Sequence, residues 1–196
     1  MNTRIFIVHG WGGYPEEGWF PWLKQELEKV GCDIFVPQLP EPQTPDKEKW
    51  ISALANSVGM PDERTFFIGH SLGCQTIARY VETLSPATRI GGAIFVAGFF
   101  QRLTGLENEA ESQRIADNWI NAPVDFKKIY SLLPKSIAIF SDNDPWVPLD
   151  NVNDFEHKIH SEIIIEHNKG HFSGSRDGAF TLPLVLEKMI GLVNGV

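Results

Sequence analysis

The chain lacks the features that mark several classes of protein. It has two cysteines, Cys32 and Cys74, which are too few for a disulfide framework and too far apart for a CxxC metal site. We interpret both as small buried hydrophobic residues of a reducing compartment. No run approaches the roughly 18 apolar residues of a membrane span, and the first apolar segment is too short for a signal-peptide core. We therefore expect a cytoplasmic protein.

Positive charge is also scarce. Lys and Arg number 17 against 25 Asp and Glu, which gives a formal net charge of -8, and no long block of basic residues occurs. Nucleic acids and anionic membranes need a clustered positive field, so we expect neither as a partner. We therefore expect the partner to be a small molecule, with a protein partner left unidentified. With 42% hydrophobic and 21% charged residues, the 196-residue chain is typical of one globular domain spanning residues 1–196.

What is present is a regular alternation of apolar runs and helical patterns. Six short runs predict buried strands: Ile5–Val8, Ile34–Val36, Phe66–Ile68, Ala93–Val96, Ile137–Phe140 and Ile163–Ile165. Helices are predicted at Trp19–Val30, Asp46–Val58, Ser71–Leu84, Val124–Leu132, Leu149–Ile159 and Thr181–Val193. This order predicts an α/β fold, a three-layer sandwich with a mainly parallel six-stranded sheet.

The segment from Gly98 to Pro123 interrupts the alternation. It is polar and helix-prone from Glu107 to Asn121, and it is too long for a simple connection. Long insertions in such folds often lie over the functional edge. The segment is therefore either a partial cover over a site or a surface helix without a role.

The third apolar run is followed by Gly69-His70-Ser71-Leu72-Gly73 and then by a helical pattern. This sequence matches G-x-S-x-G, in which a sharp turn lifts the serine clear of its neighbours. The helix N-terminus adds positive partial charge where an oxyanion would form. The same residues also fit a structural role, in which Ser71 caps the helix and the glycines permit a tight turn.

A nucleophilic serine needs a base and an acid, which in this architecture follow later strands in the order Ser, Asp or Glu, His. Asp142 and Asp144 follow the fifth run, and His167 and His171 follow the sixth. We prefer Asp144 because a proline fixes the turn after it, which leaves Asp142 to bond its own loop. We prefer His171 because it lies farther past the strand, behind a glycine, and can fold back over the sheet edge.

The loop after the first run, His9-Gly10-Trp11-Gly12-Gly13, can direct a backbone N–H at an acyl oxygen. We expect the oxyanion hole to combine the N–H groups of Trp11 and Leu72. Aromatic side chains crowd these loops, either as an apolar pocket or as ordinary core. The tentative substrate pocket is His9, Gly10, Trp11, His70, Phe99, Trp146 and Phe172.

The segments HGWGG, GHSLGC, SDNDPWVP and NKGHF, in this order, resemble the small α/β-hydrolase family of retinoblastoma-binding protein 9 and its bacterial relatives. The resemblance spans nearly the whole chain. It implies a minimal α/β-hydrolase without a large lid domain, with Ser71 as nucleophile, Asp144 as acid and His171 as base. The L-x-C-x-E motif by which the mammalian member binds the retinoblastoma protein is not matched, because Leu72-Gly73-Cys74-Gln75-Thr76 lacks the glutamate. That partner is not carried over.

We therefore predict a serine hydrolase that cleaves a small ester, thioester or amide through an acyl-enzyme on Ser71 and needs no cofactor. The net charge disfavours a strongly anionic substrate, and Lys169 is the basic residue of these loops that could anchor a carboxylate. One alternative is a non-catalytic binding or regulatory protein with the same fold. Another is a metal site, which leaves the G-x-S-x-G turn unexplained and would use His157, His160, His167 and His171 with Asp142, Asp144 and Asp150.

Overall fold

In the computed structural model, which describes residues 2–106 and 109–195, six strands form one sheet in the order β2-β1-β3-β4-β5-β6. All neighbouring strands are parallel. The strands are β1 (Arg4–Val8), β2 (Asp33–Phe35), β3 (Thr65–His70), β4 (Gly92–Val96), β5 (Ser136–Ser141) and β6 (Glu162–Glu166). The predicted six-stranded parallel α/β fold is confirmed.

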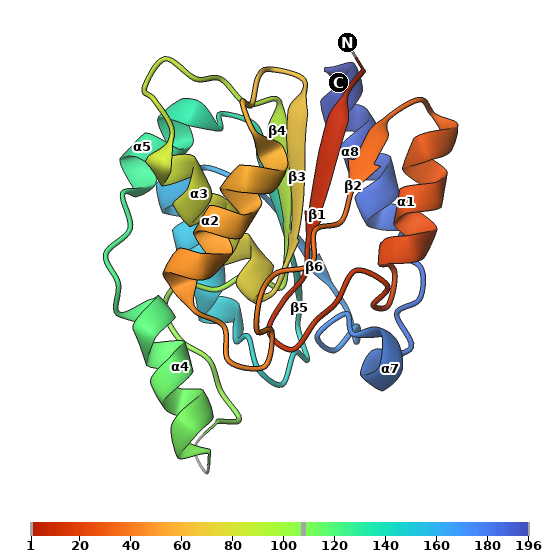
Figure 1. Cartoon of the computed structure of the whole chain (residues 1–196). Coiled ribbons are helices and arrows are strands. Elements are labelled where there is room, and N and C mark those ends of the chain that lie inside the picture. The colour runs from red at the N-terminus through yellow and green to blue at the C-terminus, as the bar shows by residue number, and fades with distance from the viewer. Residues whose placement is uncertain (1, 107–108, 196) are drawn as a thin grey trace.

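Helices cover both faces of the sheet (Figure 1). On one face lie α2 (Lys47–Val58), α3 (Leu72–Thr83) and α5 (Phe126–Leu132), and on the other lie α1 (Phe20–Lys29) and α8 (Pro183–Asn194). Each face has its own apolar cluster, because successive side chains of a strand point to opposite sides. In β1, Phe6 and Val8 join the cluster under α2 and α3, whereas Ile5 and Ile7 join the cluster under α1 and α8.

Two short segments differ from the expected elements. The helix predicted over Leu149–Ile159 is divided into a 3-10 turn, η1 (Leu149–Asn151), a short helix, α6 (Val152–Asp154), and a π-helical turn, η2 (Phe155–Ile159). It ends at His160, which adopts a left-handed conformation with φ of 61°. A further helix, α7 (Gly174–Asp177), was not predicted, because four residues are too few to show a helical period.

The insertion contains α4 (Ala110–Ile120), close to the expected helix, whose predicted first residues Glu107 and Asn108 lie outside the described residues. Both α4 and α7 lie at the end of the molecule opposite the two chain termini (Figure 1). The buried Trp119 anchors α4 by donating from its indole N–H to Pro45 O at 3.2 Å. No helix of the described chain is long and apolar enough to cross a membrane.

Candidate active site

Ser71 lies at the turn between β3 and α3 in a strained backbone conformation. Its φ of 53° and ψ of -121° are values that L-residues rarely adopt. The flanking glycines are required by close packing: a Cβ at Gly69 would lie 2.8 Å from Cys74 N, and one at Gly73 would lie 2.2 Å from Val8 O. The Ser71 side chain makes no capping hydrogen bond to α3, so the capping role considered for Ser71 is wrong. The turn thus presents this hydroxyl at the carboxyl edge of the sheet.

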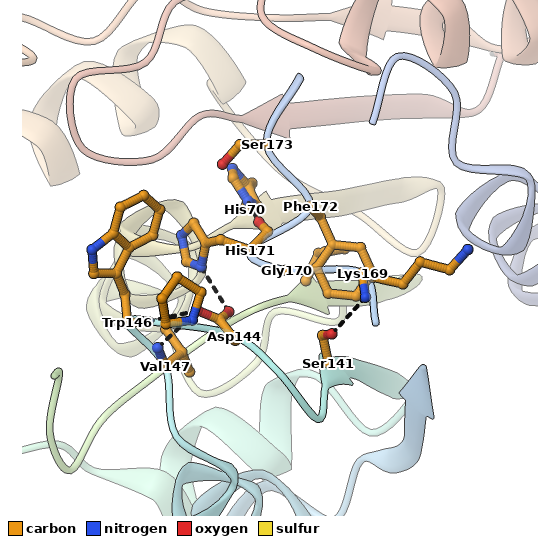
Figure 2. A network of polar contacts seen from close by, with 12 residues as sticks. His70, Ser141, Asp144, Trp146, Val147, Lys169, Gly170, His171, Phe172 and Ser173 are labelled. Atoms are coloured by element: carbon orange, nitrogen blue, oxygen red, sulfur yellow. Dashed lines mark hydrogen bonds and ion pairs between the residues drawn. The ribbon is translucent and has the colours of Figure 1, made fainter. Parts of the chain in front are cut away.

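His171 and Asp144 form a buried pair beside this turn (Figure 2). The Nδ1 atom of His171 lies 2.7 Å from Asp144 Oδ2. The other carboxylate oxygen accepts hydrogen bonds from the backbone N–H of Trp146 at 2.9 Å and of Val147 at 3.0 Å. Because a carboxylate accepts hydrogen bonds, His171 carries its proton on Nδ1, and Nε2 is left as the basic nitrogen.

Three polar contacts fix the backbone around His171. His70 Nε2 donates to His171 O at 2.8 Å, and Trp19 Nε1 donates to Phe172 O at 3.1 Å. Asp177 Oδ2 accepts from His171 N at 2.9 Å. Burial lowers the pKa of His70 to about 3, so its ring is neutral and donates from Nε2. Sequence reasoning missed the roles of Trp19 and Asp177, which depend on how distant loops pack together.

The alternative acid and base form a second, exposed pair. His167 Nδ1 lies 2.6 Å from Asp142 Oδ2, with 80% of the histidine side chain exposed. Their hydrogen bonds lower the pKa of Asp142, chiefly through Asn168 N, and raise that of His167. The expectation that Asp142 bonds its own loop is wrong, because it contacts the loop after β6.

The residues of the metal alternative do not converge. In the part of the chain that the structure describes, no group of three or more His, Cys, Asp or Glu side chains could hold a metal ion. Pairs such as Asp142 with His167 and Asp144 with His171 are separate, one exposed and one buried. The arrangement therefore favours the serine-centred interpretation.

Ser71 and His171 line one cavity of about 390 Å³. Five of the predicted pocket residues line it as well: Gly10, Trp11, His70, Phe99 and Trp146. The insertion contributes Leu103, Thr104 and Leu106, which precede α4. The segment therefore forms a wall of the cavity, while α4 itself is anchored elsewhere.

Two residues predicted for the pocket lie away from it. His9 is fully buried, its Nε2 accepts from Leu39 N at 3.0 Å, and its ring packs edge-on against Trp50 of α2. Phe172 is buried in the cluster under α1 and α8. Both predictions were wrong because these side chains point into the helix layers rather than along the sheet edge. The ring of His9 also donates from Nδ1 to Gly10 O at 2.9 Å, which holds the loop after β1.

That loop passes very close to Ser71. A Cβ at Gly10 would lie 2.9 Å from the Cβ of Ser71. Leu72 is the first residue of α3, where a backbone N–H has no helical acceptor. Among the described residues, no hydrogen bond is found from the N–H of Trp11 or of Leu72. Both donors are available beside the serine.

Two charged residues of the cavity were not predicted from the sequence. Glu17 belongs to the loop between β1 and α1, and Arg176 belongs to α7, where its guanidinium lies 4.4 Å from the ring centroid of Trp146. Neither stands in a motif, so no sequence signal pointed to them. Lys169, the basic residue expected to matter, does not line the cavity, and its side chain points away from His171 (Figure 2).

Known proteins match the chain over most of its length. Residues 5–187 match the family described as serine hydrolase. The chain is 29% identical over 187 residues to YdeN of Bacillus subtilis (strain 168), covering 95% of this chain and 94% of YdeN. It is 27% identical over 176 residues to serine hydrolase RBBP9 of Rattus norvegicus, covering 88% of this chain and 89% of RBBP9. The crystal structure of the B. subtilis ydeN product matches with a TM-score of 0.89 at 27% identity, over 98% of this chain and 100% of that one. These matches confirm the resemblance that the motifs indicated.

Proposed function

The chain belongs to the serine hydrolase family, and on this premise we propose that it hydrolyses a small ester, thioester or amide through an acyl-enzyme on Ser71. The observation that carries the proposal is the convergence of a strained serine and a carboxylate-bound histidine on one cavity. Strain of this kind is maintained where the surrounding structure enforces it, commonly at reactive sites.

In the proposed acylation step, His171 Nε2 takes the proton of Ser71 Oγ as the oxygen attacks the substrate carbonyl carbon. The same nitrogen then gives this proton to the leaving group as its bond to the acyl carbon breaks. Asp144 holds the tautomer with the proton on Nδ1 and stabilises the transient imidazolium. Water, deprotonated by His171, releases the acid and restores Ser71.

The unpaired N–H groups of Trp11 and Leu72 support an oxyanion hole. Gly10 lets the loop after β1 approach Ser71, and α3 begins directly after the serine. Preorganised backbone donors stabilise the negative charge that develops on the carbonyl oxygen, and one such donor is typically worth about 3 kcal/mol.

The cavity supports a small substrate. Its volume of about 390 Å³ is at the lower end of the range for small-molecule sites. Trp11, Phe99 and Trp146 give it apolar walls. We propose an acyl group of a few carbons, held against these rings.

The proposal is tested by replacing the nucleophile. Ser71→Ala should abolish labelling by a fluorophosphonate probe and hydrolysis of short p-nitrophenyl esters, and parallel thioester and amide substrates then identify the preferred bond. Ser131→Ala, on the exposed face of α5, is the matched control and should keep both activities. Labelling that survives in Ser71→Ala would contradict the assignment.

We also propose a cytoplasmic location and a small molecule, rather than nucleic acid or a membrane, as the partner. The two buried, unpaired cysteines and the net charge of -8 support this. Cell fractionation with an antibody against the chain tests the location.

A further inference from the structure

The loop between β1 and α1 brings a carboxylate to the cavity. Glu17 precedes Gly18, which has a φ of +51° and packs directly on the backbone of α7. A Cβ at Gly174 would lie 2.4 Å from Gly18 Cα, so these two glycines permit contact between the loops. This contact places Glu17 beside the segment that carries His171, and both residues line the cavity.

On its other side, the Glu17 carboxylate lies against Gly13. Oε2 of Glu17 lies 2.6 Å from the position that a Cβ on Gly13 would take. The N–H of Gly13 donates to Gly10 O at 3.1 Å, which forms a tight turn in the loop after β1. Glu17 therefore lies between the loop that supplies the Trp11 N–H and the histidine of the site.

Glu17 is a carboxylate at the cavity without an ion-pair partner, whereas the two other acidic residues near the site are bound to the segment that carries His171. Asp144 is bound to His171, and Asp177 accepts from the N–H of His171 and of Ser173. No ion pair of Glu17 occurs within residues 2–106 and 109–195. Burial raises its pKa, an effect opposed by the nearby His171 and by the backbone of Tyr14. A cation arriving with the substrate would offset this cost of burial.

A single carboxylate without metal-ligand neighbours suits an ammonium group better than a metal ion. The described residues contain no His, Cys, Asp and Glu cluster that could hold a metal. Arg176, the cation at the cavity, lies over Trp146 and not on Glu17. The net charge of -8 attracts cations to the molecule as a whole.

From these observations we propose that Glu17 selects substrates that carry a positively charged ammonium group close to the bond that is cleaved. The inference rests on the proposed serine hydrolase function and specifies its substrate class. Glu17 would bind the ammonium by a charge-assisted hydrogen bond or direct charge contact, while Ser71 attacks the neighbouring carbonyl. Glu17 lies between the loop that supplies the Trp11 N–H and His171. The ammonium can therefore belong to either the acyl or the alcohol part of the substrate.

The test compares esters that differ by one charge. In the first pair, the 2-naphthyl ester of alanine carries the ammonium on the acyl side, and the 2-naphthyl ester of propionic acid lacks it. In the second pair, butyrylcholine carries the charge on the alcohol side, and 3,3-dimethylbutyl butyrate is its neutral counterpart. Near neutral pH we expect wild-type kcat/KM to favour the charged ester of at least one pair. In Glu17→Gln the ratio of charged to neutral kcat/KM should fall about tenfold to hundredfold in that pair, mainly through KM.

Glu16→Gln is the matched control, because Glu16 is the adjacent exposed carboxylate and does not line the cavity. It should keep the wild-type ratio. A wild-type ratio of one or less in both pairs overturns the inference. So does an unchanged ratio in Glu17→Gln, including the case in which both esters slow together because Glu17 acts on His171 instead.

Two further measurements keep the outcomes distinct. If Glu17→Gln does not fold, competition on the wild type replaces it: butylammonium should inhibit hydrolysis of the propionate ester at lower concentration than butyramide, and equal inhibition overturns the inference. Ser71→Ala separates the two proposals. Hydrolysis that persists without Ser71 contradicts the serine hydrolase function, whereas Ser71-dependent hydrolysis with no charge preference contradicts the role of Glu17 alone.

Discussion

Two histidine–aspartate pairs with nearly the same Nδ1–Oδ2 distance lie at the carboxyl edge of the sheet. The distances are 2.7 Å for His171 with Asp144 and 2.6 Å for His167 with Asp142. Their surroundings differ: the first pair is almost fully buried beside the cavity, while water screens the second. At the scale of the residue, burial rather than distance decides which pair can stabilise a charge during a reaction.

Asp144→Asn tests this difference. Asn can accept the hydrogen bonds of Trp146 N and Val147 N, but it does not hold the imidazole in the tautomer with a free Nε2. We expect kcat to fall about 10,000-fold with little change in KM. Asp142→Asn should keep activity within about threefold, because its pair is exposed. Steady-state ester hydrolysis measures both, and equal losses in the two variants would contradict the assignment.

His70 should make stability depend on pH. Its pKa is lowered from 6.5 to about 3 in the folded protein, so between these values the unfolded chain binds more protons than the folded one. The free energy of unfolding therefore rises with pH across this window and is lost as the solution is acidified. His70→Gln keeps an N–H donor for His171 O but does not titrate. Urea denaturation should show a shallower dependence between these pH values in the variant, and parallel curves would refute the prediction.

The sequence predicted those site residues that are placed by strand ends and missed those that are placed by contacts between loops. Ser71, Asp144 and His171 each follow a buried run, and parallel strands end at the same edge, so their proximity was predictable. Glu17 and Arg176 reach the cavity through loop–loop packing, which has no sequence period. His9 and Phe172 were misassigned because chain adjacency to a site residue does not fix the direction of a side chain.

At the scale of the element, α3 does more than carry the nucleophile. Arg79 of α3 is 5% exposed, and its guanidinium donates to the backbone oxygens of Trp119, Ala122 and Pro123 at 2.7, 3.1 and 3.2 Å. These oxygens belong to the end of α4 and the connection to α5. The insertion is therefore tied to the helix that begins at the serine.

Arg79→Met should loosen this attachment. Three carbonyl oxygens lose their donor, and we expect the free energy of unfolding to fall by about 2–4 kcal/mol. Arg89→Met is the control, since Arg89 is exposed and its guanidinium donates to Pro86 O and Thr88 O of its own turn. Its effect should stay within about 0.5 kcal/mol. Chemical denaturation compares the two, and equal small effects would show that the carbonyls find other partners.

Element length explains which parts of the fold were predictable. The strands were located by runs of branched and aromatic residues, and the long helices by their apolar period. The segment Leu149–Ile159 has a helical pattern, yet its backbone changes from 3-10 to α to π. Phe155, at the start of the π-helical turn, packs against Phe95, Phe100 and Phe140. Packing of this kind is tertiary and leaves no period in the sequence.

At the scale of the whole molecule, the cavity lies at the end of the fold opposite the termini and is bordered by loops (Figure 1). The described residues include no large lid domain: the insertion supplies a wall through Leu103, Thr104 and Leu106, and α4 is anchored by Trp119. A substrate therefore approaches through solvent under the field of the entire chain. That field is negative, because the formal net charge is -8.

Ionic strength should then separate substrates by charge even before they reach Glu17. At low salt, the negative field attracts cationic esters toward the cavity and repels anionic ones. Added salt screens both effects, because the Debye length falls to about 10 Å at 0.1 M. We expect kcat/KM to fall with added salt for butyrylcholine, to rise for a succinate half-ester and to stay constant for 3,3-dimethylbutyl butyrate. Glu17→Gln removes only one negative charge from the molecule. The salt dependence of kcat/KM in this variant should therefore keep the same sign as in the wild type. A cationic ester whose kcat/KM is insensitive to salt would show that local contacts alone govern its capture.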